Sequence, residues 1–177
     1  MSFFKLTYGY QIAMKITLSA LLGLFVFVSS AAAEHHGHSA GKLSFISNGE
    51  FVLDTIKAGD MKHTIAELKG LGNIIDSKYA SMPKGTVFAF SCTGSSVEKN
   101  GESNLFALCL AKDKDGDEFS IENVRVGSIG VPGPGSSVMR GVSGKFTGLM
   151  GTCTYQPTYM MNDGVFVSVA YDCDMKH

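Results

Sequence analysis

The feature that most constrains the fold is the stretch 86–126, where three alternating apolar runs are separated by Asn100-Gly101 and Asp115-Gly116. Asn-Gly and Asp-Gly are strong signals for a two-residue β-hairpin turn, because both central residues of a type I′ turn need a positive φ. We therefore predict a three-stranded antiparallel meander over this stretch.

The first of these turns also pairs two cysteines. With Asn100-Gly101 as the turn, Cys92 and Cys109 lie directly opposite each other, at a non-hydrogen-bonded position. Opposed Cα atoms at such positions are about 4.5 Å apart, which is within reach of a disulfide. The turn therefore predicts a Cys92–Cys109 bridge.

A second hairpin places the other two cysteines, Cys153 and Cys173, opposite each other. Its turn is the three-residue loop Asn162-Asp163-Gly164, and Pro157 interrupts its first strand, so a bulge that shifts the register stays open. An even number of cysteines in an exported chain favours two disulfides. Each would close a loop of under about 25 residues and contribute roughly 3 kcal/mol.

The first 33 residues resemble a secretory signal peptide. Lys15 precedes an apolar run over 16–28, and small residues follow up to Glu34. This is the arrangement of charged, apolar and cleavage regions in such peptides, and the run is short for a membrane span. Translation starting at Met14 is an alternative, as is an uncleaved anchor. We expect a periplasmic or secreted protein that does not span a membrane once processed.

The charge balance argues against nucleic-acid binding. The whole chain has a net charge of −1, and loss of Lys5 and Lys15 with the signal peptide changes it to −3. Phosphate neutralisation needs clustered Lys and Arg, and the sequence has no basic stripe.

The mature chain is predicted to hold a flexible His-rich arm at 34–42 and a single domain at 43–177. Short β-prone runs separated by turn signals favour an all-β barrel or sandwich. The predicted segments are a hairpin over 43–56 that turns at Asn48-Gly49, two short strands at 63–68 and 72–77 (with a helix over 61–82 as the alternative), a long Gly- and Pro-rich loop at 126–144, and a final strand pair at 145–155 and 165–172.

The central meander is apolar on both faces. A two-residue turn at Asp115-Gly116 would place Phe106, Leu108 and Leu110 on one face with Phe119 and Ile121, and Glu122 on the other face with Cys109. One face of such a sheet points inward, and the other is covered by loops, a helix or a partner subunit.

Two motifs suggest a family resemblance. Asp113-Lys-Asp-Gly-Asp-Glu-Phe and Gly144-Lys-Phe-Thr-Gly-Leu-Met-Gly-Thr-Cys-Thr-Tyr, with the cysteines before them, resemble small exported bacterial proteins related to the barrel of allene oxide cyclases and dirigent proteins. The likeness covers about residues 86–155. It implies an antiparallel meander barrel of about eight strands with an apolar cavity, often as a homo-oligomer. The active-site residues of the cyclases have no counterparts that can be aligned here.

The acidic turn invites a calcium interpretation. An EF-hand loop counted from Asp113 needs Gly at its sixth position and Glu at its twelfth, but Glu118 and Val124 stand there. A tight turn in which Asp and Gly supply left-handed geometry explains Asp113, Asp115 and Asp117 better.

The arm offers a different metal site, at His35, His36 and His38. After cleavage before Glu34, His36 becomes the third residue of a free N-terminus. The terminal amine, two backbone nitrogens and the imidazole form a square-planar set that suits Cu(II) or Ni(II). A flexible solvated arm is the alternative.

Glu122 is the remaining candidate for catalysis. Facing inward, it would be a buried carboxylate suited to acid–base chemistry; facing outward, it is an ordinary surface residue, which we favour. His63 and Arg140 have no recognisable partner. We therefore expect an exported non-enzymatic barrel that binds a small apolar ligand or a protein partner. A cyclase- or isomerase-like enzyme and periplasmic copper binding are the alternatives.

Overall fold

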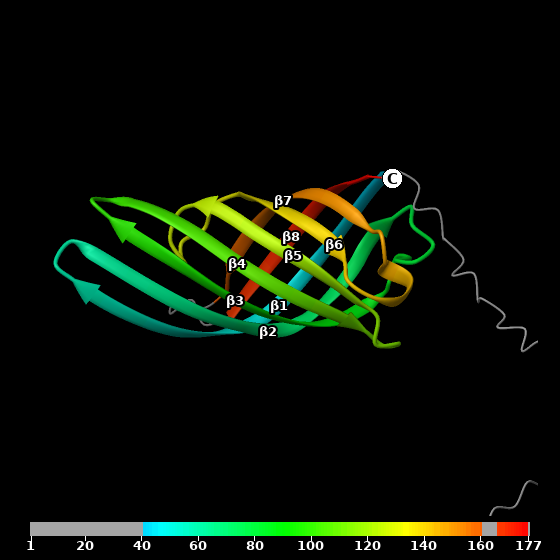
Figure 1. Ribbon diagram of the computed structural model, residues 1–177, viewed down its shortest axis with the longest axis horizontal. Helices are drawn as coiled ribbons and strands as arrows, with labels where there is room; N and C mark the ends of the chain where they lie inside the picture. Colours follow the sequence, from blue (N-terminus) through cyan, green and yellow to red (C-terminus); the bar gives the residue numbers. More distant parts are fainter. Residues whose placement is uncertain (1–40, 161–165, 177) are drawn as a thin grey trace, which may run out of the picture. The chain divides into compact units, whose positions relative to one another are not determined.

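The computed structural model describes residues 41–160 and 166–176, and these form a closed antiparallel barrel of eight strands (Figure 1). Every strand pairs with its neighbour in sequence, and β8 closes the barrel against β1. The strands are β1 Gly41–Ala58, β2 Met61–Ser77, β3 Val87–Lys99, β4 Glu102–Asp113, β5 Glu118–Val126, β6 Gly135–Gly141, β7 Met150–Tyr159 and β8 Phe166–Lys176. The predicted all-β meander barrel is confirmed. The predicted signal peptide and the turn at 162–164 lie outside the described residues, as does most of the arm; β1 begins at Gly41.

The first hairpin differs from the prediction, because β1 runs without a turn through Asn48-Gly49. Gly49 instead pairs with Gly70 in the middle of β2, which is itself one strand rather than two short strands or a helix. A Cβ atom on Gly70 would lie 1.9 Å from the carbonyl oxygen of Asn48. These glycines therefore permit a close approach of two long strands, which is a common reason for glycine inside a strand.

The β3–β4 hairpin has the predicted register, since Asn100 and Gly101 both have positive φ and Cys92 pairs with Cys109. The β4–β5 register is shifted by one residue from the prediction. Asp113 pairs with Asp117 through a 3.1 Å bond from its N–H to the Asp117 carbonyl, and Gly116 has a φ of 88°. The connection is thus a three-residue loop and not a two-residue turn.

This one-residue shift moves every side chain of β5 to the opposite face. Ile121 pairs with Cys109 and points inward, whereas Glu122 pairs with Leu108 and lies on the outer face. The predicted grouping of Phe106 with Phe119, and of Glu122 with Cys109, was wrong.

The segment predicted as a long loop at 126–144 contains the strand β6, which separates a loop around Pro132-Gly-Pro-Gly from a short connection to η1. The predicted strand at 145–155 begins later, at Met150, because Gly144–Phe146 form the 3-10 helix η1. No helix among the described residues is long and apolar enough to cross a membrane.

Both predicted disulfides are present. Cys92–Cys109 and Cys153–Cys173 each join directly opposed residues with a Cα–Cα distance of 3.9 Å. The β7–β8 register continues unchanged past Pro157, which pairs with Val169, so no bulge forms there.

One end of the barrel is filled by side chains, and we call it the plugged end. It holds the loop after β2, which contributes Tyr79 and Met82, and η1, which contributes Phe146. Edge-to-face contacts join Phe146 to Phe119 at 5.3 Å and Phe119 to Phe88 at 5.0 Å. These contacts close this end with aromatic packing.

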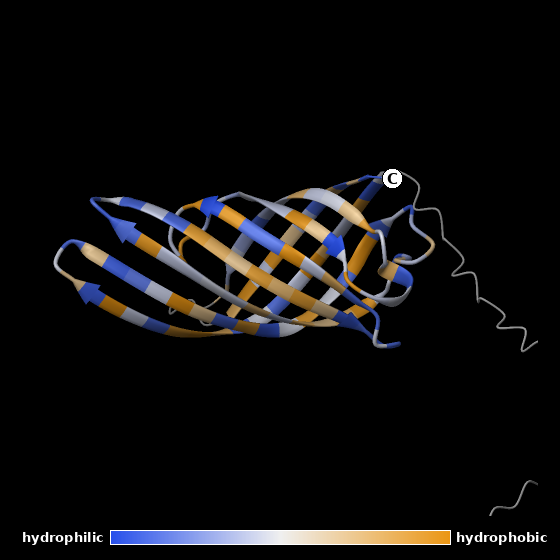
Figure 2. Cartoon of the chain, in the orientation of Figure 1, coloured by the Kyte–Doolittle hydropathy of each residue, from blue (hydrophilic) through white to orange (hydrophobic). Residues whose placement is uncertain are grey.

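The outer face of β4 is apolar along its middle, and Val124 of β5 extends this apolar group. Phe106, Leu108, Leu110 and Val124 are all 45–50% exposed, and β4 is hydrophobic over most of its length (Figure 2). The two-sided apolar character expected from the sequence is therefore real, although a different set of residues shares each face.

Candidate ligand-binding pocket

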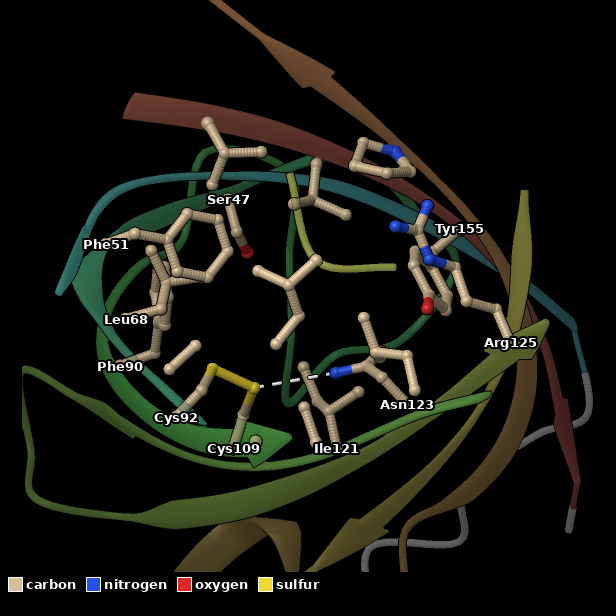
Figure 3. A pocket seen from close by; sticks show the side chains of 18 of the residues that line it. Ser47, Phe51, Leu68, Phe90, Cys92, Cys109, Ile121, Asn123, Arg125 and Tyr155 are labelled. Atoms are coloured by element: carbon tan, nitrogen blue, oxygen red, sulfur yellow. Dashed lines mark hydrogen bonds between the residues drawn. A yellow bond between two sulfur atoms is a disulfide. The ribbon is translucent and has the colours of Figure 1, made fainter. Parts of the chain in front are cut away.

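The other end of the barrel, where β5 and β6 are joined by the loop at 127–134, contains an internal pocket. Its volume is about 70 Å³, roughly five times what a single water needs. The walls are mostly apolar, with Phe51, Leu68 and Phe90 on one side and Tyr155 and Arg125 on the other (Figure 3). The lining, apolar with a few convergent polar groups, is of the kind that small-molecule sites have, although the space is small for such a site.

The floor of the pocket is held by the first disulfide and a polar pair. Asn123 donates a 3.5 Å hydrogen bond from Nδ2 to Sγ of Cys109 (Figure 3). Its Oδ1 accepts a 2.6 Å hydrogen bond from the hydroxyl of Ser137. Because its amide is occupied on both sides, Asn123 is a positioned part of the wall.

Arg125 is buried in the pocket wall and organises the loop at 127–134. One terminal nitrogen donates to the carbonyl of Gly133 at 2.9 Å, and the other donates to the carbonyls of Val131, at 2.6 Å, and Ser128. The loop is thereby folded around the guanidinium group.

The same loop is tied across the pocket end by contacts with other strands. The N–H of Gly130 donates to the hydroxyl of Tyr159 at 3.1 Å, and the N–H of Ile129 donates to Ser96 at 3.4 Å. These bonds place Ile129 on the pocket wall. The first part of the Gly- and Pro-rich segment therefore borders the pocket.

Tyr155 packs with its ring against Gly135, its partner across the β6–β7 ladder. A Cβ atom on Gly135 would lie 2.3 Å from the ring, so only glycine leaves this space. The Tyr155 hydroxyl is buried and has no hydrogen-bond partner among the described residues, and the same holds for Nε of Arg125. Burial raises the pKa of Tyr155, and the nearby charge of Arg125 acts against that rise.

Glu122, the sequence candidate for catalysis, is not in the pocket. It lies on the outer face, where its Oε1 atom is 3.3 Å from Nε of Arg140. The favoured interpretation of Glu122 as a surface residue agrees with this position. Arg140, expected to lack a partner, has one.

The acidic turn is occupied by a side chain from η1. Lys145 contacts Asp113 and lies 2.8 Å from Oδ2 of Asp115 and 3.9 Å from Oδ2 of Asp117. Oδ1 of Asp113 accepts bonds from the N–H groups of Asp115, at 2.9 Å, and Asp117, at 3.1 Å. Gly144 is required here, because a Cβ atom on it would lie 1.7 Å from Asp117 Oδ1. The two sequence motifs thus form one structural unit, with an ammonium group among the carboxylates.

The charges of this unit shift one another's pKa values. Burial alone would raise the pKa of Asp113, but hydrogen bonds from Lys145 and from the turn backbone outweigh it and lower that pKa. Hydrogen bonds from Lys114 and Lys145 lower the pKa of Asp115 to about 2. Hydrogen bonds to Asp113 and Asp115 raise the pKa of Lys145.

The predicted copper or nickel ligands His35, His36 and His38 lie outside the described residues. His63 lies in β2 opposite Val97 of β3, away from the pocket. The sequence analysis did not single out Arg125 or Tyr155 as site residues. The available signal was that each alternates with outward residues of its strand, but this pattern does not tell a site residue from a core residue.

The fold and pocket define a closed up-and-down β-barrel with an internal, largely apolar site. No protein-family model matches the chain, and no curated protein matches it significantly. The likeness to allene oxide cyclase and dirigent barrels therefore stays a prediction.

Proposed function

We propose that this protein is an exported, non-enzymatic barrel that binds a small apolar ligand inside its pocket end. The observation that carries the proposal is the asymmetry of the interior. One end is filled by aromatic side chains, whereas the other keeps a space of about 70 Å³ with apolar walls. Since protein interiors normally pack with few voids larger than a water, a retained cavity of this kind supports ligand binding.

An exported location is consistent with this proposal. Two disulfides join adjacent strands of the barrel, and such bridges persist in oxidising compartments. Glu122 in the cavity would have favoured the cyclase- or isomerase-like alternative, but Glu122 lies on the outer face. Copper binding through the arm is tested separately, by comparing copper titrations of the mature protein and a His36→Ala variant.

The experiment is a titration with N-phenyl-1-naphthylamine, a neutral probe whose fluorescence rises in apolar surroundings. Ala66→Phe fills the pocket from β2, and Ala89→Phe adds the same ring to the outer face of β3 as a matched control. We expect the unmodified protein and the control to bind alike, and Ala66→Phe to bind roughly tenfold more weakly or not at all.

Circular dichroism shows whether each variant is folded, and its mass shows whether both disulfides have formed. Ala66→Leu supplies a smaller filling change if the phenylalanine variant does not fold. Equal binding by the folded filled variant and the control, or no binding by the unmodified protein, contradicts the proposal.

A second candidate function, association with another copy of the chain, is favoured by the outer face of β4 and β5. Phe106, Leu108, Leu110 and Val124 form an exposed apolar group there, and exposed apolar surfaces often mark interfaces. A two-fold contact would place this same group of side chains on both copies, so the apolar residues would cover one another. Native mass spectrometry of the protein and of Leu108→Glu tests this, and a monomer in both samples contradicts it.

A further inference from the structure

We propose that the ligand of the pocket carries a single carboxylate head group, bound by Arg125 and Tyr155, on an apolar tail. This inference rests on the proposed function and adds the chemical class of the ligand. Both residues line the pocket on the side away from Phe51, Leu68 and Phe90 (Figure 3). The pocket therefore has a polar side and an apolar side.

The first argument is charge. Arg125 is only 8% exposed, and the three groups that its terminal nitrogens contact are neutral backbone carbonyls. Within the described residues it forms no ion pair; Glu98, which accepts a hydrogen bond from Ser128 on the same loop, is not paired with it. A buried cation is costly without a compensating anion. An anionic ligand would supply that compensation.

The second argument is hydrogen bonding. Nε of Arg125 and the hydroxyl of Tyr155, whose residue is 6% exposed, are buried polar atoms without partners among the described residues. An Nε–H group can only donate, and a phenol can also donate. A carboxylate has two oxygens that accept hydrogen bonds, one for each of these donors, and hydrogen bonds to a charged acceptor are the stronger kind.

The class follows from these two arguments together. A single guanidinium balances a single negative charge, so a monocarboxylate fits better than a doubly charged phosphate. An amine head group is disfavoured, because it adds a second cation beside Arg125. The tail is apolar because Phe51, Leu68 and Phe90 offer it no polar partner.

Arg125 also holds the loop at 127–134, so its replacement would disturb the pocket for a structural reason. The test therefore begins by changing the ligand and keeping the protein intact. Octanoate, octanol and octylamine share one chain length and differ in the head group. Each compound is titrated as a competitor against N-phenyl-1-naphthylamine bound to the unmodified protein at pH 8. Native mass spectrometry counts the bound molecules.

We expect octanoate to bind roughly tenfold or more tightly than octanol, and octylamine to bind most weakly. In Tyr155→Phe, the ratio of octanoate to octanol affinity should fall by a factor of about three to ten, with octanol binding retained. Tyr79→Phe is the matched control, since Tyr79 is a buried tyrosine at the plugged end, away from the pocket. Its ratio should equal that of the unmodified protein.

The outcomes separate the two proposals. If octanol binds as tightly as octanoate, the carboxylate head group is overturned, while the proposed apolar pocket is still supported. An unchanged ratio in a folded Tyr155→Phe variant removes Tyr155 from the site. Failure of the probe and of all three ligands to bind overturns the proposed function and this inference with it.

Discussion

The ammonium group of Lys145 contacts the carboxylate of Asp113, whose side chain is only 1% exposed, and so joins η1 to the turn between β4 and β5. Replacing Lys145 by Met leaves a buried carboxylate without its cation. We expect a loss of about 2–4 kcal/mol in the free energy of unfolding, because the carboxylate of Asp113 would stay buried without a compensating charge. Urea unfolding of the oxidised protein measures it.

Lys42→Met is the control for the Lys145 variant. Lys42 pairs with Asp174 at 2.6 Å, but both side chains are about 70% exposed. Exposed pairs contribute about 0–1 kcal/mol. Equal losses in the two variants would contradict the special role of the Lys145 contact.

Stability should fall in acid because of the same turn. The folded-state pKa values of Asp113 and Asp115 lie below their ordinary value, that of Asp115 at about 2. Such groups add stability above the unfolded pKa of about 4, and this contribution disappears as the pH falls through the folded pKa. Melting temperatures at pH 7, 4 and 2.5 should decline between the last two, and less so for Asp115→Asn. An Asp60→Asn control that flattens the profile equally would refute the assignment.

The close approach of β1 and β2 at Gly49 and Gly70 predicts an asymmetric response to alanine. Gly70→Ala places a methyl group against the backbone of Asn48, so we expect a loss of about 1–3 kcal/mol or a failure to fold. Gly41→Ala meets only Lys78, at 3.7 Å, and should change stability by less than about 0.5 kcal/mol. Denaturant midpoints of the two variants measure this difference. A Gly70→Ala variant as stable as the unmodified protein would refute the argument.

The two disulfides should contribute equally to the stability of the protein but differ in their effect on ligand binding. They span 17 and 20 residues, so removing either pair by alanine should cost about 3 kcal/mol. Cys92–Cys109 lines the pocket, whereas Cys153 and Cys173 do not. Probe titration of the two double variants should show altered affinity only for the first pair. Equal affinities in both would remove that disulfide from the site.

Glu122→Gln should leave ligand affinity unchanged, because Glu122 lies on the outer face beside Arg140. Its effect on stability should stay within about 1 kcal/mol, as for other exposed pairs. Titrations with octanoate and with the neutral probe check the first expectation. A tenfold change in either would mean that the carboxylate acts on the pocket after all.

The contrast between two turns shows where prediction from sequence succeeded and failed. Asn100-Gly101 forms the predicted turn, and the Cys92–Cys109 pairing follows from it. Asp115-Gly116 is also at a turn, but the backbone bonds of Asp113 add one residue to the loop. Because side chains alternate along a strand, this one residue decides the face of Glu122.

By itself, the sequence determined the all-β character, both disulfide pairings and the β3–β4 register, because alternation and turn chemistry are properties of neighbouring residues. Only the tertiary structure decided that Gly49 and Gly70 meet in mid-strand, that Lys145 occupies the acidic turn, and that Arg125 and Tyr155 share one wall of a cavity. Each of these depends on contacts between segments that are distant in sequence. Such contacts exist only once the strands have closed into the barrel.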